Sequence, residues 1–306
     1  ADADRVVAGL TPRPGVAYTA LWLNRRGFER ARDAPNLSLK GTLIASGSEA
    51  FLKRNQNRTN AEQLDEQREM LRLYRESGLP LDWVGVMAAF GCNFEGEVPV
   101  ARVVSLVGRL LDLAAEEGVP AGTVMLLDTM AWATPLSIRR GVGAVRERFP
   151  DVQVGLHLHD TRGMGIANAY AGLEMGVTIF DAAVAGLGGC PFAGHAAAAG
   201  NVCTEDLVFM CEEMGIETGI DLDRLIDALA ALHQTHRARI ARVRQRALAE
   251  VARDQQGVLV DPAGAALGFR QADAALDEGF RDAVELADRH RVLAAVRQGD
   301  QAVTLV

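Results

Sequence analysis

The chain has 306 residues and a mass of 32.8 kDa, and 49% of its residues are hydrophobic and 24% charged. This composition is typical of a globular protein, and it excludes a disordered chain, a collagen and a disulfide-rich secreted module. With 32 Lys and Arg against 40 Asp and Glu, the formal net charge of -8 favours neither a nucleic-acid partner nor an anionic membrane surface.

The cysteines and the N-terminal segment indicate the cellular compartment in which we expect the protein. The four cysteines (Cys92, Cys190, Cys203 and Cys211) form no CxxC pair and are too few to staple a fold of this length, so we expect a reducing, cytoplasmic location. The N-terminal segment carries acidic residues and no apolar stretch, unlike a signal peptide. No run of about 18 apolar residues occurs, so no membrane span is expected.

Short β-branched segments alternate with longer amphipathic ones along most of the chain, which predicts βα units around a parallel sheet. We expect strands at residues 16–23, 37–46, 81–90, 123–129, 152–159 and 178–184. Helices are expected at residues 61–77, 98–117, 135–149, 163–176 and 204–214, with Thr204 as the N-cap of the last one. Six such units are fewer than the eight of a TIM barrel, and they would also suit a doubly wound sheet.

The alternation of strand-like and helical segments ends near residue 233. A helical stretch with five arginines between residues 237 and 246 is followed by a second helical stretch near residues 271–295. We interpret residues 1–232 as the α/β domain and residues 233–306 as a mostly helical C-terminal extension, whose basic helix presents a solvated face. The strand-like segments at residues 257–261 and 302–306 could cover an edge of the sheet.

The segment HLHD at the end of the fifth expected strand gives the sharpest chemical signal. Side chains alternate along a strand, so His157 and His159 point to the same face, at the carboxyl end where parallel α/β folds place active sites. Two imidazoles in this arrangement suit a divalent metal. The alternative is a hydrogen-bonded histidine pair that binds no ligand.

A glycine-rich loop carries the second signal. Gly188 and Gly189 allow a ligand to approach the backbone closely, and Cys190 after them could be an acid, a base, a nucleophile or an inert turn residue. Asn201 returns just before the last expected helix. Asp128 ends the fourth expected strand and could act as a base, orient a ligand or form a turn.

Together these segments resemble the 3-hydroxy-3-methylglutaryl-CoA lyase family of the DRE-TIM metallolyases. The resemblance rests on HLHDTRGMGIANAYAGLEMGV, VAGLGGCPFAG and GNVCTEDLVFM, and on SEAFLKRNQNRT, FGCNFEGEV and LDTMAWATP upstream in the same order and spacing. It implies a TIM (β/α)8-type barrel that cleaves an acyl-CoA between C2 and C3. The expected substrate is 3-hydroxy-3-methylglutaryl-CoA, as in leucine catabolism, or a related 3-hydroxyacyl-CoA such as citramalyl-CoA.

The resemblance also implies residue roles. His157, His159 and Asn201 would bind a divalent metal, Mg²⁺ or Mn²⁺, with Zn²⁺ as an alternative. Cys190 would transfer a proton to or from the reacting centre, and Asp128 would approach the substrate's tertiary hydroxyl or the metal-bound water. The residues expected along the loop and the substrate are Gly188, Gly189 and Thr129.

Two departures from the family pattern affect the expected activity. The family's first strand carries an Asp metal ligand and an adjacent Arg, its second strand carries a Glu, and nothing before residue 16 matches either strand. We therefore expect an incomplete barrel, which a homo-oligomer could stabilise, and very low lyase activity from this chain alone. The segment AGHAAAAG is longer than the common lyase loop, which favours a relative acting on an acyl-CoA such as citramalyl-CoA.

Two other function classes remain open at this point. A catalytically silent relative would keep the fold for binding or assembly. An aldolase-type or acyl-transferring relative would use the same metal scaffold, because enolate chemistry runs in both directions.

Overall fold

The computed structural model describes residues 3–14, 16–188, 200–227 and 304–305. The chain divides into two compact units. One comprises residues 1–10 and 223–292, of which the described part contains helix α1 (Ala3–Ala8). The other comprises residues 11–222 and 293–306 and contains every further element described below.

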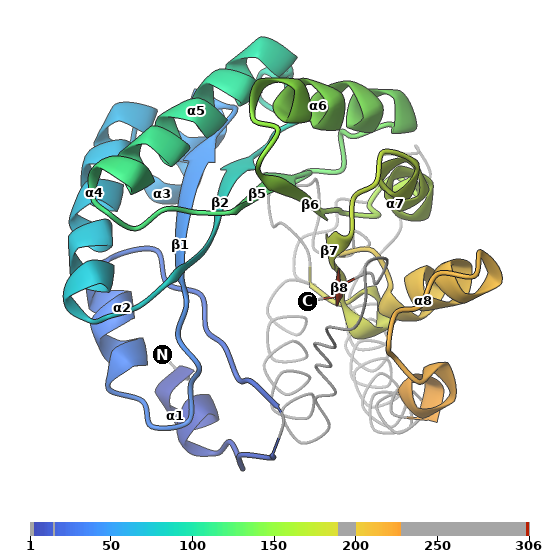
Figure 1. Ribbon diagram of the computed structural model, residues 1–306, viewed down its shortest axis with the longest axis horizontal. Helices are drawn as coiled ribbons and strands as arrows, with labels where there is room; N and C mark the ends of the chain where they lie inside the picture. The colour runs from blue at the N-terminus through green and yellow to red at the C-terminus, as the bar shows by residue number, and fades with distance from the viewer. Residues whose placement is uncertain (1–2, 15, 189–199, 228–303, 306) are drawn as a thin grey trace, which may run out of the picture. The chain divides into compact units, whose positions relative to one another are not determined.

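The larger unit is built on a parallel sheet (Figure 1). Six strands lie in the order β1-β2-β5-β6-β7-β8, and each neighbouring pair runs parallel. The strands are β1 (Gly41–Ser46), β2 (Leu81–Met87), β5 (Thr123–Leu127), β6 (Gln153–His157), β7 (Ile179–Asp181) and β8 (Thr304–Leu305). The sequence therefore predicted the α/β class and the parallel sheet correctly, and the described strands form an open sheet.

The helices of this unit are α2 (Arg25–Arg32), α3 (Glu49–Gln56), α4 (Asn60–Glu76), α5 (Val100–Glu116), α6 (Pro135–Arg148), α7 (Gly165–Glu174) and α8 (Thr204–Glu213), with a 3₁₀ turn η1 (Val184–Gly186) and a small hairpin of β3 (Gly91–Cys92) and β4 (Gly96–Glu97). The five helices expected from the sequence are present as α4 to α8, whereas α2 and α3 were not expected. Figure 1 shows α5 and α6 along the outer face of the sheet. On α5, the residues Val103, Leu106 and Leu110 recur at helical spacing and are buried, which fixes that face of the helix against the sheet.

The outer edge of β1 is closed by polar side chains of α4. The Asn60 side chain accepts from Ser46 N (3.0 Å) and donates to Ser46 O (2.8 Å). Gln67 Oε1 accepts from Ile44 N (2.8 Å), and Gln63 Nε2 donates to Ile44 O (3.3 Å). These three side chains, buried on one face of α4, occupy the place of a neighbouring strand.

The expected strand at residues 16–23 is not a strand in the structure. Its backbone bond to a distant segment runs from Ser38 N to Tyr18 O (2.7 Å). Trp22 is buried and donates through Nε1 to Tyr74 Oη (2.6 Å). The alternating apolar pattern therefore reflects side-chain anchoring against a helix, and β1 meets α4 at the edge where a strand was expected.

The expected N-cap of the last helix needs correction, and several expectations for the C-terminal part of the chain lie outside the described residues. Thr204 is the first helical residue of α8, and Cys203 holds the N-cap position without a side-chain cap bond. The expected helix near residues 271–295, the strand at residues 257–261, and the domain boundary at residues 232–233 all lie outside the described residues. Of the segment 302–306, Thr304–Leu305 pairs with β7 as β8.

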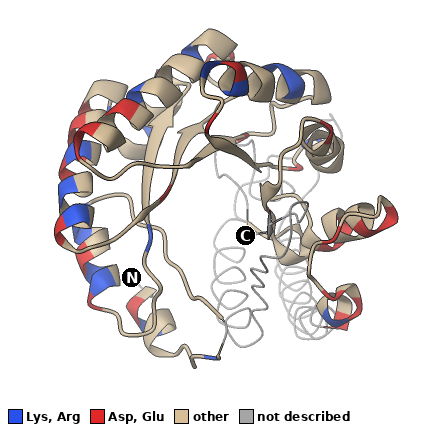
Figure 2. Ribbon diagram, viewed as in Figure 1, with Lys and Arg blue, Asp and Glu red and all other residues tan. Residues whose placement is uncertain are grey.

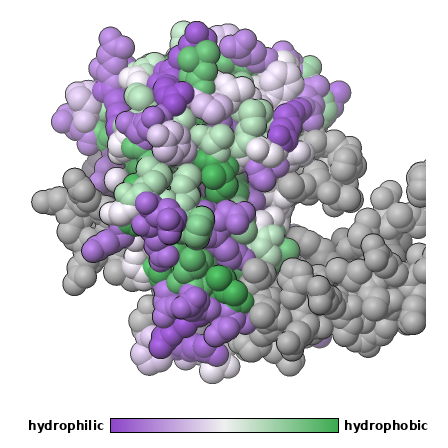
Figure 3. Space-filling view, turned by 90° about the vertical axis from the view of Figure 1, so that its right-hand side faces the viewer, coloured by the Kyte–Doolittle hydropathy of each residue, from purple (hydrophilic) through white to green (hydrophobic). Residues whose placement is uncertain are grey.

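The described surface is charged and mixed. Lys and Arg alternate with Asp and Glu on the outer helices, while α8 carries mainly acidic residues (Figure 2). In the face shown in Figure 3, polar side chains predominate and hydrophobic ones reach the surface between them. Within the described residues, no helix is both long and apolar enough to cross a bilayer.

Candidate metal centre at the carboxyl ends of the strands

Three neighbouring strands end at or just before an Asp or a His, side chains that can bind a metal or transfer a proton. Asp128 follows β5 directly, His157 ends β6, and Asp181 ends β7. The strand register places His157 beside Leu127 on one side and beside Asp181 on the other. Because parallel strands present their carboxyl ends at one edge, these side chains gather there.

The two histidines lie together, as the alternation of the strand predicts. Their rings meet edge to face with centroids 5.0 Å apart. His157 Nδ1 lies 3.0 Å from Asp181 Oδ2, and His159 Nδ1 lies 2.9 Å from the carbonyl oxygen of Asp128. A carbonyl or carboxylate oxygen accepts only, so each Nδ1 carries a proton, and in a neutral ring the lone pair is then on Nε2. Metal-binding histidines have this arrangement, in which the outer partner fixes the tautomer.

Asn201 is brought beside these histidines by backbone pairing. It forms an isolated antiparallel bridge with His159, supported by bonds from Asp160 N to Gly200 O and from Val202 N to Leu158 O (2.9 Å each). Its Nδ2 donates to Leu187 O (2.9 Å), whereas its Oδ1 is buried and has no hydrogen-bond partner among the described residues. A buried amide oxygen without a partner is costly unless a ligand satisfies it.

Only one carboxylate oxygen of Asp128 has hydrogen-bond partners among the described residues. Its Oδ1 accepts from Trp132 N (2.7 Å) and Ala133 N (2.9 Å), which is the turn-forming role that the sequence left open. Its Oδ2 is buried and has no hydrogen-bond partner in the part of the chain that the structure describes. Burial raises the pKa of this carboxyl to about 6, although the two backbone N–H donors oppose the shift.

His159 is held neutral. Burial, followed by the neighbouring His157, lowers the pKa of His159 to about 4, although its bond to the Asp128 carbonyl opposes the shift. At neutral pH the ring therefore offers a lone pair at Nε2 without first having to lose a proton. A neutral imidazole is the form that binds metals.

The donor set fits a divalent cation. Among the described residues, no three His, Cys, Asp or Glu side chains cluster closely enough to hold a metal. The unpartnered Oδ1 of Asn201, next to His159, supplies an amide oxygen. Mixed imidazole and oxygen ligands suit Mn²⁺, Mg²⁺ or Zn²⁺.

The remaining expected site residues fall into two groups. Thr129 Oγ1 accepts from Ala88 N (2.8 Å) and so ties the loops after β5 and β2 together. Gly188 has a φ of +78°, its carbonyl accepts from Asn201 N (3.0 Å), and a Cβ there would lie 3.0 Å from Asn201 Nδ2. Gly189 and Cys190 lie outside the described residues, and their roles stay predictions.

Sequence reasoning did not single out Asp181 as a site residue. The signal was an acidic residue at a strand end, as for Asp128, but its contact with His157 depends on the register between β6 and β7. Arg162 was also missed: Nη1 donates to the carbonyls of Met130 (2.6 Å) and Ala131 (2.9 Å) and so braces the loop after β5.

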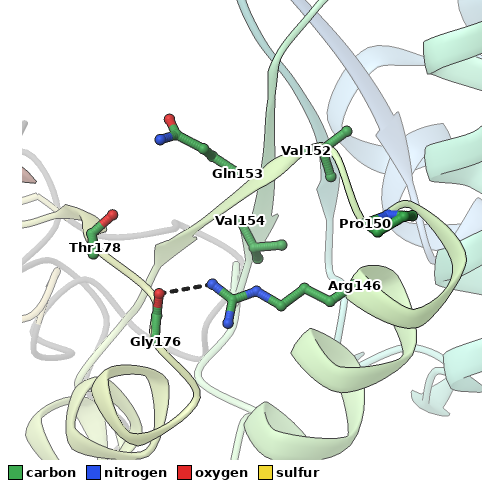
Figure 4. Close-up of a pocket in the computed structure, with 7 residues that line it drawn as sticks. All are labelled: Arg146, Pro150, Val152, Gln153, Val154, Gly176 and Thr178. Carbon is green, nitrogen blue, oxygen red and sulfur yellow. Dashed lines mark hydrogen bonds between the residues drawn. The ribbon is translucent and has the colours of Figure 1, made fainter. Parts of the chain in front are cut away.

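A separate hollow of about 420 Å³ opens beside the amino-terminal part of β6 and the segment before β7 (Figure 4). Arg146 reaches into it and donates to Gly176 O (2.7 Å) and to Met175 O, at the C-terminal end of α7. This guanidinium therefore caps a helix. The hollow lies toward the strand ends opposite to the histidines, away from the candidate metal centre.

Comparisons with known proteins identify the family of the chain. The HMGL-like family model matches residues 9–232. The mitochondrial hydroxymethylglutaryl-CoA lyase of Gallus gallus is 36% identical over 227 residues, covering 74% of this chain and 72% of the relative. The (R)-citramalyl-CoA lyase of Chloroflexus aurantiacus is 40% identical over 211 residues, covering 69% of this chain and 63% of the relative.

Solved structures give the same relationship. The HMG-CoA lyase of Bacillus subtilis aligns with a TM-score of 0.68 at 33% identity, covering 76% of this chain and 75% of that one. The HMG-CoA lyase of Acinetobacter baumannii, solved with coenzyme A and 3-methylmalate, aligns with a TM-score of 0.64 at 37% identity, covering 74% and 70%. On the extent of these matches, the chain belongs to the HMGL-like family.

Proposed function

We propose that this protein is a metal-dependent carbon–carbon lyase that cleaves a 3-hydroxyacyl-CoA into acetyl-CoA and a keto acid. The observation that carries the proposal is the pair of Nδ1-anchored histidines beside the unpartnered Asn201 Oδ1. Its support from relatives is the 3-hydroxyacyl-CoA chemistry named for the lyases of Gallus gallus and Chloroflexus aurantiacus. HMGL-like proteins are generally dependent on a divalent metal.

The residues of this chain divide the work. His157, His159 and Asn201 would hold the cation, Mg²⁺ or Mn²⁺, with Zn²⁺ as the alternative. A bound divalent cation supplies Lewis acidity that lowers the pKa of a coordinated substrate hydroxyl. Asp181 and the Asp128 carbonyl keep both imidazoles in the tautomer that ligation needs.

Proton movement falls to two other groups. The Asp128 carboxyl, with a pKa of about 6, is suited to take the proton of the substrate hydroxyl near neutral pH. As the C2–C3 bond breaks, its electron pair forms the thioester enolate and the hydroxyl carbon becomes a ketone. Protonation of the enolate carbon gives acetyl-CoA, and Cys190 is the proposed donor.

The test is a product assay sensitive to slow turnover. Purified protein with Mn²⁺ would be incubated with 3-hydroxy-3-methylglutaryl-CoA or with citramalyl-CoA, and acetyl-CoA and the keto acid would be quantified by mass spectrometry. We expect equimolar products from one of the two, lost on chelation and in His157→Ala. Product formation that survives both treatments, or no product from either thioester, would contradict the proposal.

Two further proposals concern the carrier of the substrate and the cellular location of the protein. We propose a thioester substrate with coenzyme A as its carrier, since coenzyme A is bound in the Acinetobacter baumannii relative. We also propose a reducing, cytoplasmic location, a choice supported by the three described cysteines, all of which are free thiols.

A further inference from the structure

Glu205 is a buried carboxylate that the proposed chemistry does not use. It lies in the first turn of α8 and is 8% exposed. Both of its oxygens face the backbone N–H of Ala185, with Oε1 at 2.9 Å and Oε2 at 3.0 Å. The thiol of Cys203 also donates to Oε2 (3.0 Å). A buried charge is retained only where such donors compensate its lost hydration.

Its main partner, Ala185, has an unfavourable backbone conformation. The φ of +59° and ψ of +19° lie in the left-handed region, where an alanine is strained. The turn η1 that contains it directs the chain from β7 into the glycine segment at residues 186–188. A charged acceptor on the Ala185 N–H offsets that strain, since hydrogen bonds to charged groups are the stronger ones.

The glycine segment in turn holds Asn201. Leu187 O accepts from Asn201 Nδ2 and Gly188 O from Asn201 N. The two chain segments are so close that a Cβ on Gly200 would lie 1.5 Å from Gly188 O. A shift of the turn at Ala185 would therefore move the carbonyls that determine which way Asn201 Oδ1 faces.

We propose that Glu205 is a positioning residue for the metal centre: by holding the left-handed turn at Ala185, it fixes the glycine segment and thereby the orientation of Asn201 Oδ1. This inference rests on the proposed function, because it assigns Asn201 as a metal ligand. Glu205 does not itself contact the cation. The competing explanation is that Glu205 serves only as a negative charge at the N-terminus of α8.

The experiment separates these explanations by matched variants. Asp206 is exposed in the same turn of α8, so Asp206→Asn removes the same charge from the same helix end without touching Ala185. Mn²⁺ affinity would be measured by electron paramagnetic resonance for the wild type, Glu205→Ala, Asp206→Asn, and Glu205→Ala combined with Ala185→Gly. Backbone hydrogen exchange at Ala185 and Asn201 would be followed in the same proteins.

Loss of an outer partner of a metal site typically costs 10–100-fold in affinity, and we expect Glu205→Ala to weaken Mn²⁺ binding by about tenfold or more. Asp206→Asn should bind as the wild type does. Adding Ala185→Gly should restore most of the lost affinity, because glycine adopts the turn without strain. Rescue by a substitution that adds no contact is a result that general destabilisation of α8 would not give.

The contrary results are distinct. Unchanged Mn²⁺ affinity in Glu205→Ala, an equal loss in Asp206→Asn, or failure of Ala185→Gly to rescue would each overturn the inference. If the wild type bound no Mn²⁺, the proposed function would fail instead. Hydrogen exchange at Asn201 would then still decide whether Glu205 holds the segment, since faster exchange in Glu205→Ala, reversed by Ala185→Gly, is expected without any metal.

Discussion

Asp128 serves the fold and the site with different oxygens. Oδ1 organises the turn after β5 through two backbone donors, while Oδ2 is buried without a partner among the residues described. A raised pKa means that the ionised form is penalised in the folded state. From pH 3.8 to about 6, rising pH therefore removes stability through this group, and above pH 6 the full cost persists.

Asp128→Asn should consequently be more stable than the wild type at neutral pH, because the amide cannot ionise. The upper limit of the gain is about 3 kcal/mol, and the gain should grow by about 1 kcal/mol between pH 5 and pH 7.5. Urea unfolding of both proteins at the two pH values checks this. The titration of His159 is common to both proteins and cancels in the difference. A gain that shrinks as pH rises would show that the carboxyl is not penalised.

Asp181 contacts the imidazole of His157. Its carboxylate accepts from Nδ1 at 3.0 Å and fixes the tautomer that leaves Nε2 for a metal. Asp181→Asn keeps the size of the side chain, but the amide can turn its donor toward the ring and favour the other tautomer. We expect Mn²⁺ affinity to fall about 10–100-fold with little change in thermal stability, as measured by calorimetric titration and a melting curve. Equal affinities would mean that Asp181 is only a surface partner of His157.

At the residue scale, the sequence predicted the features that depend on the alternation of side chains along a strand and on local spacing. His157 and His159 share a face because they are two residues apart, His157 at the end of β6 and His159 just beyond it. The partners of their Nδ1 atoms, Asp181 and the Asp128 carbonyl, come from neighbouring strands. Strand register depends on packing across the whole sheet, and so neither contact could be read from the local pattern.

At the scale of elements, buried amide side chains of α4 bond the edge of β1, an interaction that a search for periodic apolar residues does not detect. Thr59 and Glu62 form a capping box that starts α4, and the sequence located this helix to within one residue. Its buried face carries Asn60, Gln63 and Gln67, whose amides bond the β1 backbone. A pattern search treats such residues as solvent-facing, and it placed a strand at residues 16–23, beside the edge that these amides occupy.

The two glutamines of α4 have opposite roles, which gives a matched prediction. Gln63 donates to Ile44 O, whereas Gln67 accepts from Ile44 N. Gln67→Glu keeps the acceptor, but Gln63→Glu places an ionised carboxylate against a carbonyl. We expect Gln63→Glu to be the more destabilising at pH 8, by about 1–2 kcal/mol, because a buried acceptor loses its donor.

The pH dependence of Gln63→Glu should follow from the same contact. Its new carboxyl would have a raised pKa in the folded state, so stability should be regained as the pH falls and the protonated carboxyl donates to Ile44 O. Urea unfolding at pH 5 and pH 8 checks both variants, and the exposed Glu69→Gln of α4 is the control. Equal losses in the two variants at both pH values would mean that the amides do not bond the strand edge.

At the scale of the molecule, the two edges of the sheet are closed differently. The amides of α4 cover β1, while β7 pairs with the two-residue strand β8 from the far end of the chain. The strand-like character of residues 302–306 was visible in the sequence. Its pairing partner was not, because a contact between residues 179 and 304 depends on the fold of everything between them.

Deleting residues 304–306 should therefore expose the edge of β7. We expect faster backbone hydrogen exchange at Ile179 and Phe180, with exchange at Leu43 and Ala45 of β1 unchanged. An exposed strand edge also promotes association, so sedimentation should detect larger species at high concentration. Unaltered exchange at Ile179 and Phe180 would mean that β8 does not close this edge in solution.

The candidate metal centre depends on all three scales, since it requires two imidazole tautomers fixed by a carboxylate and a backbone carbonyl, three strands in register and one returning loop. Its most direct test is nitrogen-15 resonance spectroscopy of the histidine side chains during titration with Zn²⁺, a diamagnetic probe. Of the six histidines in the chain, His157 and His159 should both start as Nδ1–H tautomers and show large Nε2 shifts together at one equivalent. Asn201→Ala should weaken that response. Ligation by only one of the two, binding through Nδ1, or an Asn201→Ala response equal to the wild type would contradict the account.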